Sequence, residues 1–123
     1  MTSVTVDTIF LNKRVLDILE RLELELKNLN YWKNTELPLS YYNSMEPFFM
    51  DKMELHEWLQ FVLIRKFREI IYCESRLPAS CKVFPYAFEF YKNEKAKHMQ
   101  LLKIINELDR CFSDNWLKFF KNT

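Results

Sequence analysis

Three carboxylates near the middle of the sequence have the spacing best suited to chemistry. Asp51, Glu54 and Glu57 recur every third position, so on a helix they lie on consecutive turns. Two such acids can act as general acid and general base when their environments separate their pKa values. Acids in the first turn of a helix also stabilise it through the helix dipole. That structural role is the simpler interpretation of the three.

Histidine and cysteine could build two other kinds of site, a Cys–His nucleophile or a metal centre. The chain contains two histidines and three cysteines, at His56, His98, Cys73, Cys81 and Cys111. None of them has CxxC, HxxxH or HExxH spacing, and phosphate-binding loops require glycines that this chain lacks. We therefore predict no catalytic residue, no metal and no cofactor. The cysteines are expected to be reduced thiols, packed mostly as small apolar groups.

The overall composition narrows the classes of function. Of the 123 residues, 18 are basic and 17 acidic, and this net charge of +1 lacks the basic excess typical of nucleic-acid binders. No stretch reaches the roughly 18 apolar residues that span a bilayer, and no signal peptide is evident at the first residues. We expect a cytoplasmic protein with no direct nucleic-acid or membrane binding. The sequence offers no signal for an oligomeric state.

Apolar periodicity predicts the elements that must position these residues. Apolar residues that recur at steps of three and four positions predict long helices over about 8–28, 52–72 and 94–112, with a short helix beginning near Pro85. Tight hairpin turns need glycine or Asn-Gly, and neither occurs, which argues against a β-rich fold. We predict an all-α protein, a mostly antiparallel bundle of four to five helices. Residues 1–123 form one domain, with an aromatic extension over 114–123.

The start and the centre of the second helix carry more detail. Asp51 and Glu54 have the spacing of a capping box, which would start the helix at about residue 52. The helix is apolar nearly all round, so it should be central in the bundle. Gln60 lies on the same side as Leu63 and Phe67. We therefore expect Gln60 to be buried or half-buried and to need a hydrogen-bond partner. We predict that residues 30–44, which precede the second helix, form an ordered loop folded over the end of the bundle.

One series of short motifs resembles a known family. The series reads WKN at 32–34, PFFMD at 47–51, ME at 53–54, EWLQ at 57–60, VLI at 62–64, LP at 77–78, Val83 and PY at 85–86. Its order and spacing over about 11–114 are similar to the YqcC-like family of small bacterial proteins without an established biochemical activity. Relatives tend to have proline at the positions of Leu55 and Arg65. Losing the first proline should leave the helix start less sharply fixed, and losing the second should remove a kink.

The resemblance implies a helical bundle of four or five helices. It also implies a genomic setting, because relatives are often encoded beside a tRNA pseudouridine synthase. That setting suggests an accessory or interaction role in tRNA modification. The family supplies no catalytic residues that could be carried over to this chain.

We therefore interpret the chain as a non-catalytic interaction protein. Its expected surface is the 47–60 segment with the Pro85–Tyr86 turn, and the residues singled out are Pro47, Phe48, Phe49, Met50, Asp51, Glu57, Trp58, Gln60, Pro85 and Tyr86. The same residues could instead only fix a loop against the core.

Two other functions stay open. One is a small-molecule or lipid-tail binding bundle with a pocket lined by Phe49, Trp58, Phe67 and Tyr86 and Gln60 as its polar group. The other is an enzyme that uses Asp51, Glu54 or Glu57.

The most specific prediction concerns Phe48, Phe49 and Met50. They stand between a proline and a helix start, where the chain must turn. A turn cannot easily hide three large side chains on one side, so at least one should remain accessible. We expect Phe48 or Phe49 to anchor a protein partner, with the tRNA pseudouridine synthase as the first candidate.

Overall fold

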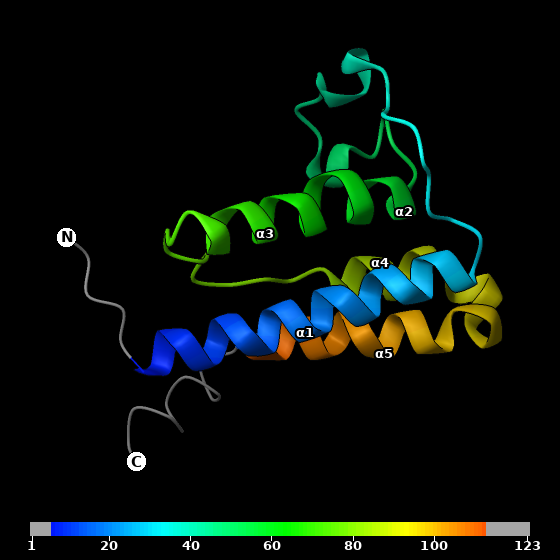
Figure 1. The fold of residues 1–123 in the computed structure, drawn as a ribbon. Coiled ribbons are helices and arrows are strands. Elements are labelled where there is room, and N and C mark those ends of the chain that lie inside the picture. The colour runs from blue at the N-terminus through cyan, green and yellow to red at the C-terminus, as the bar shows by residue number, and fades with distance from the viewer. Residues whose placement is uncertain (1–5, 113–123) are drawn as a thin grey trace.

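The computed structural model describes residues 6–112, and all regular structure in this range is helical (Figure 1). The α-helices are α1 Val6–Asn28, α2 Leu55–Trp58, α3 Arg65–Tyr72, α4 Phe84–Phe90 and α5 Lys95–Cys111. Three short 3₁₀ turns and one π-helical turn join them, at η1 Leu39–Tyr42, η2 Pro47–Phe49, η4 Lys92–Glu94 and η3 Leu59–Ile64. The predicted all-α bundle is confirmed. The predicted aromatic extension over 114–123 lies outside the described residues.

The helices form two layers (Figure 1). Helices α1 and α5 lie side by side and antiparallel, and α4 packs on α5. The segments α2, η3 and α3 form one continuous helix over 55–72 that lies across this pair and runs antiparallel to α1. The loop 30–54 folds back over the start of that helix. Within residues 6–112, no helix has both the length and the apolar character needed to cross a bilayer.

The core lies where the predicted apolar stripes meet. On α1 the fully buried residues are Val15, Ile18, Leu19, Leu22 and Leu26. On α5 and at its C-cap the residues spaced three and four apart are all buried, namely His98, Leu101, Ile105, Leu108 and Phe112. An ion pair of 2.6 Å between Arg21 and Glu107 joins the two helices at the edge of the core. Burying a face this broad gives most of the stability of a small helical domain.

A chain without glycine has to end its helices differently. After α1, Asn30 takes a left-handed backbone with φ of 63°, and the next amide donates to the Leu26 carbonyl at 2.9 Å. After α3, Glu74 does the same with φ of 54°, and the Ser75 amide donates to the Ile70 carbonyl at 3.0 Å. This is the Schellman arrangement, in which glycine usually occupies the left-handed position.

The start of the continuous helix over 55–72, called the central helix below, corrects one prediction. The capping residue is Glu54, not Asp51, and its backbone amide donates to the Glu57 side chain at 2.8 Å. The helix therefore begins at Leu55, and the capping box fixes that start. Just before Arg65 the helix widens into the π turn η3. Turns of this kind insert an extra residue and often mark functional sites, and no sequence signal predicted this one.

Candidate functional site

Four aromatic rings form a continuous row across the two predicted segments. The Phe48 ring lies parallel to the Tyr86 ring at 4.4 Å between centroids and meets the Trp58 ring edge-on at 4.8 Å. Tyr86 in turn contacts Phe90 at 6.0 Å. We call Trp58, Phe48, Tyr86 and Phe90 the aromatic ladder. Its first three rings are half-buried, whereas Phe90 is 45% exposed.

The ladder depends on an unusual backbone at the turn before the central helix. Phe48 and Phe49 both have left-handed φ angles, 56° and 50°. Phe48 therefore packs on the main core, whereas Phe49 packs in a small second core around Leu37, Met53 and Phe61. Such angles cost a bulky residue about 1–2 kcal/mol each, and the aromatic contacts have to offset that cost.

The turn thus hides two of its three large side chains. It does so by sending Phe48 and Phe49 into separate cores, and both are half-buried. Met50 is the accessible one, at 47% exposed. This arrangement agrees with the expectation that at least one of the three side chains remains accessible.

A hollow of about 270 Å³ opens beside the ladder. We call it the Phe48 hollow, and its lining consists of Phe48, Trp58, Val62, Leu63, Lys66, Phe67, Pro78, Ser80, Cys81, Lys82 and Val83. Its floor is apolar, and its charged lining residues are both lysines. The hollow therefore combines a buried apolar surface with a positive rim.

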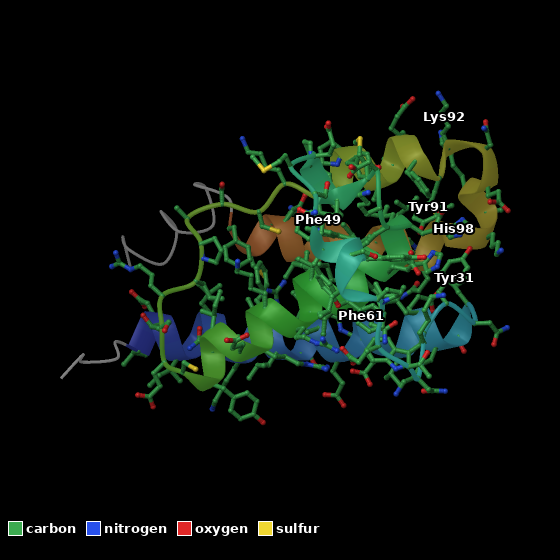
Figure 2. The ribbon with its side chains drawn as sticks, turned by 90° about the horizontal axis from the view of Figure 1, so that it is seen from above. Tyr31, Phe49, Phe61, Tyr91, Lys92 and His98 are labelled. Carbon is green, nitrogen blue, oxygen red and sulfur yellow. The ribbon has the colours of Figure 1, made fainter. Side chains whose placement is uncertain are left out.

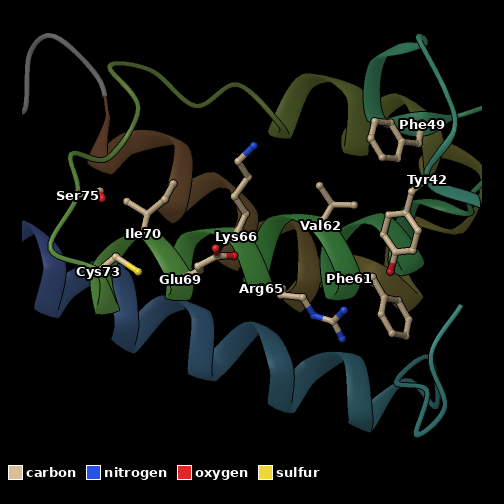
Figure 3. A pocket seen from close by; sticks show the side chains of 10 residues that line it. All are labelled: Tyr42, Phe49, Phe61, Val62, Arg65, Lys66, Glu69, Ile70, Cys73 and Ser75. Carbon is tan, nitrogen blue, oxygen red and sulfur yellow. The ribbon is translucent and has the colours of Figure 1, made fainter. Parts of the chain in front are cut away.

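A larger groove of about 500 Å³ runs along the central helix next to the Phe48 hollow (Figure 3). This Phe49 groove extends from Tyr42 and Phe49 at one end to Cys73 and Ser75 at the other, and its remaining lining is Phe61, Val62, Arg65, Lys66, Glu69 and Ile70. The Tyr42 hydroxyl is buried and has no hydrogen-bond partner within residues 6–112. Arg65 is held by Glu36 through two hydrogen bonds of 2.8 and 2.9 Å.

The three candidate acids are occupied in structural contacts. Asp51 is exposed and accepts a hydrogen bond from the Ser44 hydroxyl. Glu57 is buried, accepts the Glu54 amide and forms an ion pair with the Lys33 ammonium at 3.4 Å. Glu54 caps the helix and Glu57 lies in its first turn, as the simpler interpretation expected, whereas Asp51 lies outside the helix and contacts the loop.

Gln60 is buried and has its partner, as predicted. Its amide nitrogen donates to the Lys33 carbonyl at 2.8 Å, and its oxygen accepts the Lys33 amide at 3.0 Å. Together with Glu57, it ties the loop 30–38 to the central helix. Gln60 lines neither the Phe48 hollow nor the Phe49 groove. Its hydrogen-bonding capacity is used by the backbone instead.

A polar cluster inside the bundle escaped sequence reasoning (Figure 2). His98 is fully buried, and its Nδ1 lies 2.9 Å from the Glu94 carbonyl, which can only accept. Nδ1 therefore carries the proton, and Nε2 accepts a hydrogen bond of 2.7 Å from the Tyr31 hydroxyl. Tyr91 stacks on the same imidazole at 3.9 Å, and His56 stacks on Tyr31 at 4.5 Å. His98 lies in register with the buried residues Leu101 and Ile105, and this periodicity carries no sign of its partners.

The His56 side of this cluster predicts how stability depends on pH. Burial lowers the pKa of His56 below 6.5, and nearby Lys33 and His98 add to the effect against the opposing charges of Glu57 and Glu54. The unfolded chain thus binds this proton more readily than the folded chain. Stability is expected to fall as the pH drops below about 6.5, which a series of urea titrations from pH 7.5 to 5.5 measures.

The variant His56→Phe keeps an aromatic ring against Tyr31 but cannot bind a proton. It should lose most of the pH dependence between 7.5 and 5.5 while keeping the loss below about pH 4.5, because the pKa values of Glu23, Glu36 and Glu107 are lowered by their arginine or lysine partners. An unchanged profile in this variant contradicts the assignment to His56.

The three cysteines are free thiols in separate environments. Cys73 is exposed at the end of the Phe49 groove, Cys81 is half-buried in the Phe48 hollow, and Cys111 is buried. Burial raises the pKa values of Cys81 and Cys111, which disfavours their reactive thiolate forms. Among residues 6–112, no three histidine, cysteine or acidic side chains come close enough to hold a metal ion.

The structure thus divides the predicted surface into four parts. Phe48, Trp58 and Tyr86 come together in the ladder, as part of one surface. Glu57 and Gln60 instead face the loop at Lys33. Phe49 lies in the second core. The remaining predicted residues are exposed around the ladder or its turn, namely Pro47, Met50, Asp51 and Pro85.

Comparison with known proteins places the chain among small bacterial relatives. The family model DUF446, described as tRNA pseudouridine synthase C, matches residues 14–111. The uncharacterized protein YqcC of Escherichia coli K12 is 34% identical over 97 residues, which cover 79% of this chain and 89% of that protein. An uncharacterized protein of Haemophilus influenzae is 32% identical over 97 residues, covering 79% of this chain and 91% of the relative.

The fold agrees with a solved structure as well. The solution NMR structure of YqcC from Escherichia coli superimposes with a TM-score of 0.72 at 34% identity. It covers 85% of this chain and 89% of the solved chain. The match therefore extends over most of this chain and most of the solved chain.

Proposed function

This chain belongs to the YqcC-like family, and from that membership and the aromatic ladder we propose that it is a non-catalytic accessory protein that docks a protein partner. The first candidate partner is a tRNA pseudouridine synthase. The family description carries the name of that enzyme, whereas the two relatives compared here are named as uncharacterized proteins. A small helical protein that works beside the enzyme accounts for both.

The contacts made by the three candidate acids support a non-catalytic role. Asp51, Glu54 and Glu57 are the residues that could have served as acid and base, and each one makes a contact that holds the turn or the helix start. An acid–base pair needs groups that converge on a place where a substrate can lie. These three side chains instead stabilise the backbone that carries the ladder.

The observation that carries the proposal is the ladder itself. It joins residues far apart in the sequence, Phe48 and Tyr86, at ring-stacking distance, and it opens to solvent at Phe90. Aromatic side chains are enriched at the energetic centres of protein interfaces, where they combine large apolar area with little side-chain entropy. The hollow beside the ladder could receive a side chain of the partner.

The test uses two exposed phenylalanines on the same helix. Phe90 is 45% exposed and belongs to the ladder, whereas Phe88 is 41% exposed and lies outside it. Calorimetric titration against the tRNA pseudouridine synthase encoded in the same genome should show Phe90→Ala binding about 10-fold more weakly, with Phe88→Ala within about twofold of wild type. Phe48→Ala should weaken binding about 30-fold, which corresponds to a loss of roughly 2 kcal/mol.

Melting temperatures separate binding from packing. Phe48 is half-buried, so its truncation also removes core contacts, and Phe90→Ala is the variant that should keep the wild-type melting temperature. If Phe90→Ala and Phe88→Ala bind equally well, the ladder is packing and not an interface. If wild-type protein shows no binding at tens of micromolar, the synthase is not the partner.

One observation favours a second function. The Phe49 groove, at about 500 Å³, falls within the range of roughly 300–1,000 Å³ that small-molecule sites occupy. Its polar group would be the Tyr42 hydroxyl in place of Gln60, since this hydroxyl has no hydrogen-bond partner among residues 6–112. Native mass spectrometry of the purified protein distinguishes the two, because a retained small ligand that is lost in Tyr42→Phe supports the binding bundle over the docking protein.

A further inference from the structure

The Phe48 hollow and the Phe49 groove adjoin each other. Val62 and Lys66 line both of them, so these two side chains form the ridge between the hollows. They lie four residues apart on the central helix, where side chains share a face. In Figure 3 both project from this helix along the groove, with Ile70 further along. A partner that covers one hollow therefore also meets the other.

The charges around the ridge are mostly positive. Lys66 and Lys82 line the Phe48 hollow, and no acid does. In the Phe49 groove, Glu36 offsets the charge of Arg65, and Glu69 is the acid of the lining. Neither Lys66 nor Lys82 has an ion-pair partner in the part of the chain that the structure describes. The positive charge is therefore concentrated at the Phe48 hollow and at Lys66 on the ridge, whereas the charges of the Phe49 groove are balanced.

Extending the proposed docking function, we infer that the two hollows form one docking surface for an acidic, amphipathic segment of the partner protein. An apolar side chain of that segment fills each hollow, and its carboxylates lie beside Lys66 and Lys82. The groove follows the helix from Phe61 to Ile70, about 14 Å or two to three turns at the rise of an α-helix, and reaches Cys73 and Ser75 just past the helix end. Peptide segments recognised in apolar grooves commonly use this arrangement of spaced apolar anchors.

A protein segment fits this surface better than RNA. The hollows have apolar floors, and one face of the Phe48 ring is already covered by Tyr86, so little ring surface is left for stacking a base. The overall charge of +1 also gives a polyanion little long-range attraction. Local positive charge around apolar hollows matches an acidic segment with apolar anchors.

Charge reversal tests the inference on the intact chain bound to the synthase. Lys66→Glu and Lys82→Glu should each weaken binding about 10-fold, mainly through slower association, and should flatten its salt dependence between 50 and 200 mM NaCl. Lys103→Glu, an exposed lysine on α5, is the matched control and should stay within about twofold of wild type. Lys66→Gln should fall between wild type and Lys66→Glu, and all variants should keep their melting temperature.

A second readout follows the far end of the Phe49 groove. Cys73 is an exposed free thiol there, so its alkylation by iodoacetamide should slow at least about 10-fold in the complex if the segment extends that far. Unchanged alkylation of Cys73 in a saturated complex overturns the two-hollow arrangement. Peptide mapping by mass spectrometry assigns the modification to Cys73.

The outcomes separate this inference from the proposed function. If wild type binds the synthase and Phe90→Ala weakens binding, but all three lysine variants behave alike, the ladder is an interface and the acidic segment is wrong. If the chain alone binds tRNA and Lys66→Glu abolishes that binding, the surface is an RNA site and the inference is overturned. If wild type does not bind the synthase at all, the proposed partner and this inference both fall.

Discussion

His98→Ala is expected to lower the free energy of unfolding by about 3–4 kcal/mol, the largest effect of any polar residue in the described core. His98 is fully buried, stacks on Tyr91 and exchanges hydrogen bonds with Tyr31 and Glu94. Alanine leaves a cavity and deprives the Glu94 carbonyl of its side-chain donor. Urea denaturation measures the loss, and the melting temperature should fall by about 10 °C.

Two variants separate the hydrogen bonds from the packing. Tyr31→Phe removes only the hydroxyl that donates to Nε2 and should cost about 1 kcal/mol. Met99→Ala truncates the next residue of α5, which is exposed, and should cost less than about 0.5 kcal/mol. If His98→Ala costs no more than Tyr31→Phe, the imidazole is not a packed core group and the structure of the cluster is wrong.

Phe48→Gly is expected to be more stable than Phe48→Ala by about 1 kcal/mol, the reverse of the usual order. Both variants lose the ring contacts with Trp58 and Tyr86, so both should be roughly 2 kcal/mol or more less stable than wild type. Glycine, however, accepts the φ of 56° without the steric cost that alanine pays. The comparison thus measures the backbone strain directly.

The neighbouring residue supplies the control. Met50 has an ordinary φ of −62°, so Met50→Gly should be less stable than Met50→Ala by about 0.5–1 kcal/mol. Thermal and urea denaturation of the four variants give the two differences under one set of conditions. If glycine is the less stable choice at both positions, the left-handed turn at Phe48 is not present in solution.

Local sequence patterns were enough to predict the helices. The apolar stripe of α1 and the seam of α5 have the helical period, and burial follows that period residue by residue from Val15 to Leu26 and from His98 to Phe112. Gln60 was predictable for the same reason, because a polar residue on an apolar face must be buried with a partner. Helix ends were less predictable, since Asn30 and Glu74 take positions that are usually marked by glycine.

The candidate site depended on contacts that no local pattern carries. Phe48 and Tyr86 are 38 positions apart, and Tyr31 and His98 are 67 apart, so their meeting depends on the angle at which whole helices pack. The sequence placed PFFMD and PY among the residues of interest, but it could not indicate that one turn would send Phe48 and Phe49 into different cores.

Periodicity therefore determined which face of each helix is buried, because burial of an apolar stripe is a property of the segment alone. The tertiary structure decided which buried and half-buried side chains touch. It imposed left-handed backbone on two phenylalanines, because the ring contacts of Phe48 and the packing of Phe49 in the second core outweigh the local strain. It also placed Lys66 and Val62 between two hollows, an arrangement that exists only once loops from distant parts of the chain close around the central helix.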